Sequence, residues 1–354
     1  MLLFSKGSYS YESVKEAIVR DLALRKPRVF VSSFGEKVFL DAIAADPRIL
    51  VYLYGYSVRL SLFSSSAIDV HYHNEKVKLS DVEYAKTKED AEGMIQYALT
   101  RFKPMMYLIF PSNIDVRQLL SDFTNKYMAM YPGCDSTEAM EAPLDFPLPF
   151  RCIQILFKYK ISRYKLNQMN KQLNGEVSMV CKKIFLPSMP PLVKAYVAHN
   201  YLVRNVKYWK EDPTTPEETV IRHSAYGALI RHRCVCQGYA EAFQRLMDSQ
   251  GIENYYLFGS IKDDPSGLHG WNLVAIDNVS AFHVDTTWDA QYGIGKDVYF
   301  GLSDREMIPK RTWSRKFGKP ALSDKNWAQE ARRIIQNNLS LYLRGGIDKK
   351  YLVL

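Results

Sequence analysis

Three side chains in the second half of the sequence have the types that thiol-based acyl transfer needs. They are Cys236 in Val-Cys-Gln-Gly-Tyr-Ala, His269 in His-Gly-Trp-Asn and Asp285 in His-Val-Asp-Thr-Thr-Trp-Asp. A cysteine thiolate attacks a carbonyl carbon, a histidine accepts and returns the proton, and a carboxylate orients the histidine ring. The pattern therefore indicates the chemistry of a Cys-His-Asp triad.

The residues after Cys236 predict a helix that begins at the cysteine. Ala240, Phe243 and Met247 recur at helical spacing, and Gly251 stands where a left-handed C-terminal cap is expected. Unpaired amides and the positive end of the helix dipole stabilise a thiolate at such a position. For any single cysteine, the alternative is a buried thiol that only packs.

A predicted hairpin brings the histidine and the aspartate together. Its strands are residues 271–276 and 281–286. A hairpin centred on residue 277 places His269 directly opposite Asp285, on one face of the sheet. An aspartate in that place fixes the imidazole tautomer and leaves the other ring nitrogen to serve the thiol.

These motifs resemble those of the transglutaminase-like superfamily of papain-like cysteine enzymes, and of its bacterial members in particular. The family pattern reads Val-Cys-x-Gly-Tyr-Ala, His-x-Trp-Asn and His-Val-Asp-x-Thr-Trp-Asp, and this chain has all three in that order. The resemblance implies Cys236 as nucleophile, His269 as general base and acid, and Asp285 as the group that orients His269. It covers about residues 190–309 and implies no metal and no organic cofactor.

One residue departs from the family pattern. The position two before the nucleophile is usually glycine, and here it is Cys234. Three interpretations stay open: a tolerated substitution, redox control by exchange between Cys234 and Cys236, and metal binding by these two with His232 and His269. The metal interpretation lacks a second ligand pair at zinc spacing.

An acyl-transfer site also needs hydrogen-bond donors for the oxyanion. The backbone amide of Cys236 can supply one. Tyr226 and Gln237 are candidates for another, although packing is the favoured role for Tyr226. Trp271 is a candidate substrate contact, but together with Trp288 it is expected mainly to shield the histidine and aspartate from water.

The length of 354 residues exceeds one ordinary domain, so two are expected. We expect an N-terminal α/β domain of unknown role over residues 1–186 and a transglutaminase-like catalytic domain over residues 187–354. A linker rich in proline is predicted at residues 186–191, where three prolines break any regular element. The fold class is α+β, with a papain-like C-terminal domain in which the cysteine helix packs on an antiparallel sheet.

The first domain shows a weak internal repeat at an offset of 77 residues, which aligns Pro27 with Pro104. Each proline follows a predicted helix and precedes an apolar, strand-like segment. Two related units of about residues 1–80 and 81–186 are therefore expected. Chance similarity between two helix-strand-helix patterns is the alternative.

The basic charge is concentrated in one stretch. The chain carries 47 Lys and Arg against 38 Asp and Glu, a net charge of +9, and eight of the basic residues lie between Arg151 and Lys183 with the single acid Glu176. We predict two strands here, with Lys158, Lys160 and Lys182 on a solvated face. An anionic partner at these basic strands, such as nucleic acid or an acidic surface, is the alternative.

No apolar run reaches the length of a membrane helix, so no membrane span is expected. Charged residues also interrupt the first thirty positions, where a secretory signal needs an apolar stretch. Five cysteines are an odd number and do not form a disulfide framework for a chain of this size. A cytoplasmic location is therefore predicted, with a removed leader or another export route left open.

The resemblance implies attack on an amide carbonyl of a protein or peptide substrate, through a thioester. Water resolves the thioester in a peptidase or amidase, and a lysine amine resolves it in a transglutaminase. Hydrolysis is the safer expectation, because water is always available and transfer needs a site that excludes it. The alternative of another class is a binding or scaffold protein that retains the fold without turnover.

Overall fold

The computed structural model describes residues 10–59, 66–72, 77–127, 131, 133–141, 149–262, 264–313 and 320–352. The chain forms two compact units, neither of which is continuous in sequence. The first consists of residues 1–98, 103–123 and 136–157, and the second of residues 99–102, 124–135 and 158–354.

The division at residues 186 and 187 predicted from the sequence differs from these units, because residues 158–186 group with the second one. The assignment of two domains with separate roles stays a prediction.

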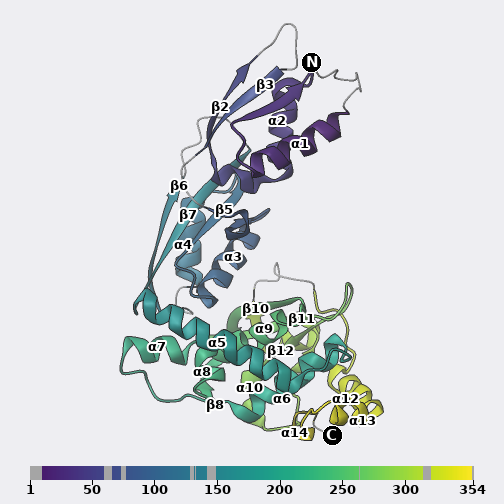
Figure 1. The fold of residues 1–354 in the computed structure, drawn as a ribbon. Helices are drawn as coiled ribbons and strands as arrows, with labels where there is room; N and C mark the ends of the chain where they lie inside the picture. The colour runs from purple at the N-terminus through teal and green to yellow at the C-terminus, as the bar shows by residue number, and fades with distance from the viewer. Residues whose placement is uncertain are drawn as a thin grey trace. The chain divides into compact units, whose positions relative to one another are not determined.

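The first unit opens with a three-stranded antiparallel sheet and two helices that pack on it (Figure 1). Ser10 caps the first helix by accepting a hydrogen bond from the Ser13 amide at 3.1 Å, and Ile18 and Leu22 are buried on its inner face. In chain order the elements are α1 (Tyr11–Ala23), β1 (Arg28–Ser32), α2 (Gly35–Ala45), the 3-10 helix η1 (Pro47–Val51), β2 (Leu53–Arg59) and β3 (Ser66–Tyr72).

A four-stranded mixed sheet follows in the order β4-β5-β7-β6. The pair β4 and β5 is parallel, whereas β5 and β7 are antiparallel. The elements are η2 (Leu79–Asp81), β4 (Val82–Tyr84), α3 (Lys88–Thr100), β5 (Met105–Pro111), α4 (Val116–Tyr127), β6 (Cys134–Glu141) and β7 (Phe150–Tyr159).

The element boundaries follow the offset seen in the sequence. Helix α3 begins 77 residues after α1 and has the same length of 13 residues. Strand β5 also begins 77 residues after β1, and the order β1-β3-β2 has the same form as β5-β7-β6. These features are those that a duplicated α-β-α-β-β unit would have, and the duplication itself stays a prediction.

The basic stretch from Arg151 to Lys183 is not a pair of strands. Only its first part is a strand, β7, and the rest is the 22-residue helix α5 (Arg163–Ile184). Ser162 ends the strand-like alternation and caps α5 by accepting from the Lys165 amide at 3.3 Å. From there the buried residues recur at intervals of three and four, which is the period of a helix.

The prolines at residues 187–191 form a turn within the second unit. They separate α5 from α6 (Pro191–Asn205), and both helices bury side chains in the same core. Proline ends a helix whether or not a domain ends there, so the predicted linker is a sharp connection between two packed helices. The remaining helices are α7 (Pro216–Arg222), α8 (Ala225–Leu229), α9 (Cys236–Asp248), α10 (Thr286–Tyr292), α11 (Asp304–Met307), α12 (Trp327–Asn337), α13 (Leu339–Arg344) and α14 (Lys349–Leu352).

Helix α9 packs on a five-stranded antiparallel sheet, as expected for the cysteine helix (Figure 1). Tyr239 and Phe243 of α9 share a core with Val274 and Phe282 of the sheet. The sheet runs β13 (Phe300–Leu302), β12 (Ala281–Val284), β11 (Asp264–Ala275), β10 (Asn254–Ile261) and β14 (Arg311–Trp313), and a separate parallel pair joins β8 (Lys207–Tyr208) to β9 (Arg233–Cys234). Of the helices in the described residues, none combines the length and apolar character needed to cross a membrane.

Candidate active site

Cys236 is the first residue of α9, as the sequence predicts. The preceding residue, Val235, is extended and has no side-chain oxygen to cap the helix. The first amides of a helix have no partner inside it, so without a capping side chain they remain available to a negatively charged group. Cys236 is 7% exposed, and Gly251 lies beyond the far end of the helix at φ 65°. The thiol therefore lies at the positive end of a helix with little water around it.

Cys234 fits beside the nucleophile because Gly238 has no side chain. A Cβ at Gly238 would lie 2.7 Å from the Cys234 sulfur and 2.7 Å from the Ser224 carbonyl oxygen. Cys234 is fully buried, and burial raises the pKa of its thiol well above the ordinary value. A thiol that is buried and protonated is a poor partner for exchange, so the arrangement favours a tolerated substitution over redox control.

The ligand set of the metal interpretation does not assemble. His232 is exposed, whereas Cys234 is fully buried. In the parts of the chain that the structure describes, no group of three His, Cys, Asp or Glu side chains is arranged to hold a metal ion.

His269 and Asp285 form a buried pair. The Nε2 atom of His269 lies 2.8 Å from Oδ2 of Asp285, with the two residues 4% and 0% exposed. Because Nε2 is engaged by the carboxylate, the other ring nitrogen, Nδ1, remains for the thiol. Cys236 is close enough to hydrogen-bond His269, and its thiol also lies 3.5 Å from Oε1 of Gln237.

The charges of the pair stabilise each other. Burial by itself lowers the pKa of His269, but the charge and hydrogen bond of Asp285 and the hydrogen bond of Cys236 raise it to about 9. Burial raises the pKa of Asp285, and the charge of His269, followed by that of Arg311, more than offsets this and holds the pKa below the ordinary value. Asp285 is therefore a carboxylate at neutral pH, and His269 favours its protonated form.

The register of the hairpin differs by two residues from the predicted one. Ala275 pairs with Ala281 and Asn272 with Val284, so the hairpin is centred on residue 278 and Asp285 comes level with Trp271. Side chains alternate between faces with a period of two, so a shift of two residues leaves His269 on the same face as Asp285. The contact is diagonal, and the predicted pairing directly across the strands was wrong.

Asp285 also fixes the start of α10. Its Oδ1 atom accepts a hydrogen bond from the Trp288 amide at 3.2 Å, which caps the helix. The aspartate therefore has one oxygen for the histidine and one for the backbone, and its side chain is held in one orientation.

Arg311 is a member of the site that the sequence reasoning missed. Its Nη2 donates to Oδ2 of Asp285 at 3.1 Å, and its guanidinium lies 4.6 Å from the centre of the Trp288 ring. Arg311 is 2% exposed and comes from β14, the strand on the far side of β10. No motif surrounds it, and only the sheet order brings it to Asp285.

Two tryptophans enclose His269. The ring of Trp271 stacks on the imidazole at 6.0 Å between centroids, and Trp288 meets it edge-on at 6.4 Å. The indole nitrogen of Trp271 donates to Nδ1 of His283 at 3.0 Å, and Nε2 of His283 lies 2.9 Å from Asp304. Trp271 therefore contacts the site with its ring face, which suits the shielding role.

The structure places the other two candidates in different surroundings. The Tyr226 hydroxyl donates to Oε1 of Gln172 on α5 at 2.7 Å, and the ring belongs to the helical core, which is the packing role. Gln237 lies next to the nucleophile and reaches its sulfur through the amide oxygen.

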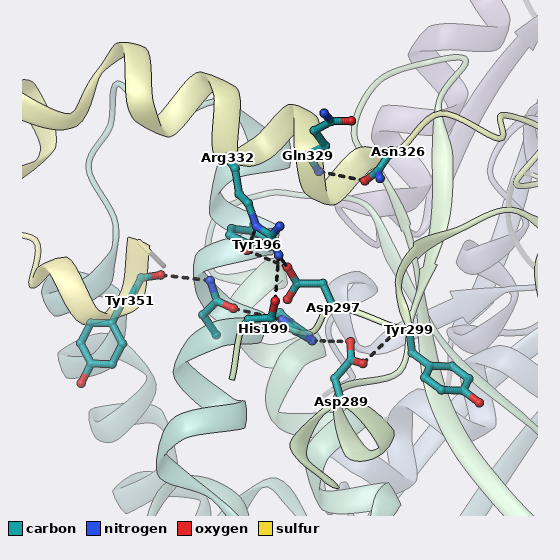
Figure 2. Close-up of polar contacts among 11 residues, drawn as sticks. Tyr196, His199, Asp289, Asp297, Tyr299, Asn326, Gln329, Arg332 and Tyr351 are labelled. Atoms are coloured by element: carbon teal, nitrogen blue, oxygen red, sulfur yellow. Dashed lines mark hydrogen bonds and ion pairs between the residues drawn. The ribbon is translucent and has the colours of Figure 1, made fainter. Parts of the chain in front are cut away.

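The second unit contains another buried His-Asp pair, formed by His199 and Asp289 (Figure 2). His199 of α6 and Asp289 of α10 are joined through Nε2 and Oδ2 at 2.9 Å. The other carboxylate oxygen accepts from the Tyr299 amide at 2.9 Å, and the Tyr299 carbonyl accepts from the Asp285 amide at 3.0 Å. This network connects the backbone of Asp285 to the helical core.

A neighbouring cluster of polar contacts involves the C-terminal helix α12 (Figure 2). Arg332 of α12 donates to the Tyr196 hydroxyl at 2.8 Å, and both residues bond Asp297. The loop before β13 is therefore held to α6 and α12 by charged groups.

Comparison with known proteins finds only distant similarity. No family model and no curated protein matches the sequence. A proposed cysteine protease from Cytophaga hutchinsonii is 11% identical, with a TM-score of 0.28 over 54% of this chain and 80% of its own. A structure described as a TGase is 12% identical, with a TM-score of 0.27 over 84% of this chain and 80% of its own.

A proposed protease from Parabacteroides distasonis is 10% identical, with a TM-score of 0.26 over 51% of this chain and 39% of its own. Similarity at this level carries no argument about activity, so a function has to be argued from the side chains of the site.

Proposed function

We propose that the second unit is a transglutaminase-like cysteine enzyme that cleaves amide bonds of a protein or peptide substrate. The observation that carries this proposal is the buried bond of 2.8 Å between His269 and Asp285, with Cys236 at a helix start beside the same histidine. A nucleophile, a base and an orienting carboxylate are the three groups that thiol acyl transfer needs.

The chemical steps follow from these positions. His269 takes the proton of the Cys236 thiol, and the sulfur attacks the amide carbonyl carbon to form a tetrahedral intermediate. The carbon–nitrogen bond then breaks, the nitrogen receives the proton from His269, and a thioester remains on Cys236. Asp285 stays ionised throughout and stabilises the imidazolium.

We propose hydrolysis as the second half of the reaction. Water attacks the thioester, His269 accepts a water proton and passes it to the departing sulfur, and an acid is released. A peptide library incubated with the protein, with and without a biotinylated primary amine, tests this assignment by mass spectrometry. Cleaved peptides or amides converted to acids support hydrolysis, whereas products that carry the amine indicate a transglutaminase. The Cys236→Ala variant is the control.

A binding or scaffold role without turnover is the competing proposal, in which the first unit recognises a partner. It predicts that Cys236 has no special reactivity and that no peptide changes in the library. The position of Cys236 at a helix start beside His269 favours the enzyme, because it gives the buried His269-Asp285 pair a nucleophile to serve.

We also propose that an anionic partner binds the basic stretch of residues 151–183, most of which is helix α5. Arg163, Lys171, Lys182 and Lys183 are exposed on this helix, whereas Lys165 pairs with Glu217 at 3.0 Å. Retention on heparin that falls with salt and with Lys171→Glu and Lys182→Glu would support this role. Retention that does not change with these substitutions would contradict it.

A further inference from the structure

The proposed reaction places a negative charge on the carbonyl oxygen, and one donor for it is still missing from the site. The amide of Cys236 at the start of α9 can provide the first hydrogen bond. Each of the three side chains considered from the sequence is engaged by other groups. Tyr226 donates to Gln172, Gln237 presents its oxygen to the thiol, and the Trp271 nitrogen donates to His283.

Tyr256 of β10 lies on the face of the sheet that carries α9. It pairs across the strands with Asn272, whose side chain donates to the Ala240 carbonyl of α9 at 3.1 Å. A tyrosine in this position extends from β10 along the inner surface of β11, towards the residues that precede Asn272.

The glycine next to the catalytic histidine makes room for this side chain. A Cβ at Gly270 would lie 2.7 Å from the Tyr256 hydroxyl oxygen and 2.7 Å from its ring carbon Cε2. The hydroxyl therefore lies against the backbone of the residue that follows His269. No larger residue fits at Gly270 unless the tyrosine moves.

The Tyr256 hydroxyl is buried and has no hydrogen-bond partner among the described residues. The residue is 7% exposed, and a buried hydroxyl without a partner costs free energy. Such groups are rare in folded proteins, and one explanation is a hydrogen bond that forms only when a substrate is present.

The electrostatic surroundings keep this hydroxyl protonated. Burial raises the pKa of Tyr256 well above its ordinary value, and the nearby charges of Tyr131, Cys236 and Glu241 raise it further. Cys236 is thus near enough to the hydroxyl for the two groups to interact electrostatically. The hydroxyl next to the backbone of Gly270 is therefore a hydrogen-bond donor without an acceptor.

We propose that the Tyr256 hydroxyl and the Cys236 amide form the oxyanion hole, an inference that depends on the function proposed above. As the carbon–sulfur bond forms, the carbonyl oxygen becomes negative and accepts both hydrogen bonds. When the carbon–nitrogen bond breaks, the carbonyl re-forms and the nitrogen leaves with the proton from His269. Tyr256 donates a hydrogen bond throughout and loses no proton, so it acts on the reacting atoms as an electrostatic catalyst.

The test separates acylation from simple alkylation of the thiol. Acylation of Cys236 by 4-nitrophenyl acetate passes through an oxyanion and releases nitrophenolate, whereas alkylation by iodoacetamide forms no oxyanion. Tyr256→Phe is expected to slow acylation by roughly 100-fold to 1,000-fold and to leave alkylation within about 2-fold of the wild-type rate.

Tyr239→Phe is the matched control, because this buried tyrosine on α9 has a bonded hydroxyl that donates to the Val206 carbonyl at 2.7 Å. It is expected to lower the urea midpoint of unfolding and to keep the wild-type acylation rate. Tyr256→Phe removes no bond and is expected to keep the midpoint. A hydroxyl with a merely structural role would give the opposite result for Tyr256→Phe, with a lower midpoint and unchanged acylation.

Gly270→Ala provides a second test, since it displaces the hydroxyl without removing it, and is also expected to slow acylation more than alkylation. Equal acylation rates in the wild type and in Tyr256→Phe, with none in Cys236→Ala, would overturn the role of Tyr256 alone. Nitrophenolate release by the wild type that does not exceed that of Cys236→Ala would overturn the proposed function as well.

Discussion

Arg311 donates to Oδ2 of Asp285 at 3.1 Å, the same carboxylate oxygen that bonds the candidate catalytic histidine. The aspartate therefore has a histidine on one side and an arginine on the other. The permanent charge of Arg311 helps to keep the carboxylate ionised, and it leaves the histidine free to gain and lose a proton.

Arg311→Met is expected to raise the pKa of Asp285, because the charge of Arg311 lowers it in the folded protein. The acidic limb of the profile of activity against pH should therefore move to higher pH. The lost charge-assisted hydrogen bond should also reduce the free energy of unfolding by about 2 kcal/mol. Urea unfolding and a pH profile of Cys236 alkylation measure the two effects.

Arg333→Gln is the control for Arg311→Met, because Arg333 forms an exposed pair with Glu330. Exposed pairs contribute little, so no measurable change in either quantity is expected. A pH profile of Arg311→Met that coincides with that of the wild type would contradict the role given to the arginine.

Asp285→Asn is expected to make stability less dependent on pH. In the wild type the folded pKa of His269 is raised to about 9 from an ordinary value of about 6.5. The contribution of protonated His269 to the free energy of unfolding is therefore complete below pH 6.5. It is lost as the pH rises through 9, a decrease on the order of 3 kcal/mol. The pKa of Asp285 is lowered in the folded protein, so its contribution to the free energy of unfolding is lost as the pH falls through that pKa.

In Asp285→Asn both changes should be smaller, because the charge that raises the pKa of His269 is gone. Urea unfolding measured from pH 4 to pH 10 gives the comparison. The same slope between pH 6.5 and pH 9 in both proteins would show that the pair does not have the charges described.

Asp289→Asn is expected to destabilise the protein without changing the chemistry. It leaves His199 buried without its anionic partner, a loss of about 3 kcal/mol. Burial lowers the pKa of His199, but the hydrogen bond and charge of Asp289 raise it by more, so the net pKa is above the ordinary value. The stability that the pair contributes is therefore lost as the pH rises through this raised pKa. Where the variant is folded, Cys236 alkylation should stay within about 3-fold of the wild-type rate, because Asp289 bonds His199 and neither Cys236 nor His269.

Gly238→Ala is expected to destabilise the start of α9, because the new Cβ would meet both the Cys234 sulfur and the Ser224 carbonyl. The substitution Cys234→Gly in the same chain should restore part of the stability, since it removes one of the two clashes. A double-mutant cycle by urea unfolding is expected to give a coupling of about 1 kcal/mol. Strictly additive effects would contradict the fit between Cys234 and Gly238.

Local pattern was sufficient to find the nucleophile and its helix. The apolar spacing after Cys236 and the glycine at residue 251 predict α9 nearly to the residue. Side chains alternate between the two faces of a sheet, and this alternation was sufficient to place His269 and Asp285 on one face. The exact register was not, because Asp277 closes the hairpin by accepting from the amides of Val279 and Ser280, a side-chain contact that shifts the centre of the turn.

Groups brought together only by tertiary structure could not be found in this way. Arg311 and Tyr256 lie in strands that flank the motifs, and neither belongs to a recognisable pattern; they reach the site because β10 lies between β11 and β14. The helix α5 is different, since its buried residues have helical spacing in the sequence. Apolar and basic residues alternate at residues 157–161, just before α5, but this strand pattern does not continue into the helix.

The central claim, that Cys236 is activated by His269, is tested most directly by the site and rate of thiol alkylation. Brief treatment with iodoacetamide at neutral pH, followed by peptide mapping, compares the wild type with His269→Ala and with the control His223→Ala, whose ring bonds the Thr219 carbonyl. We predict that Cys236 reacts before the four other cysteines, and that His269→Ala alone slows it by roughly 10-fold or more. Equal labelling of Cys236 in all three proteins would contradict the account.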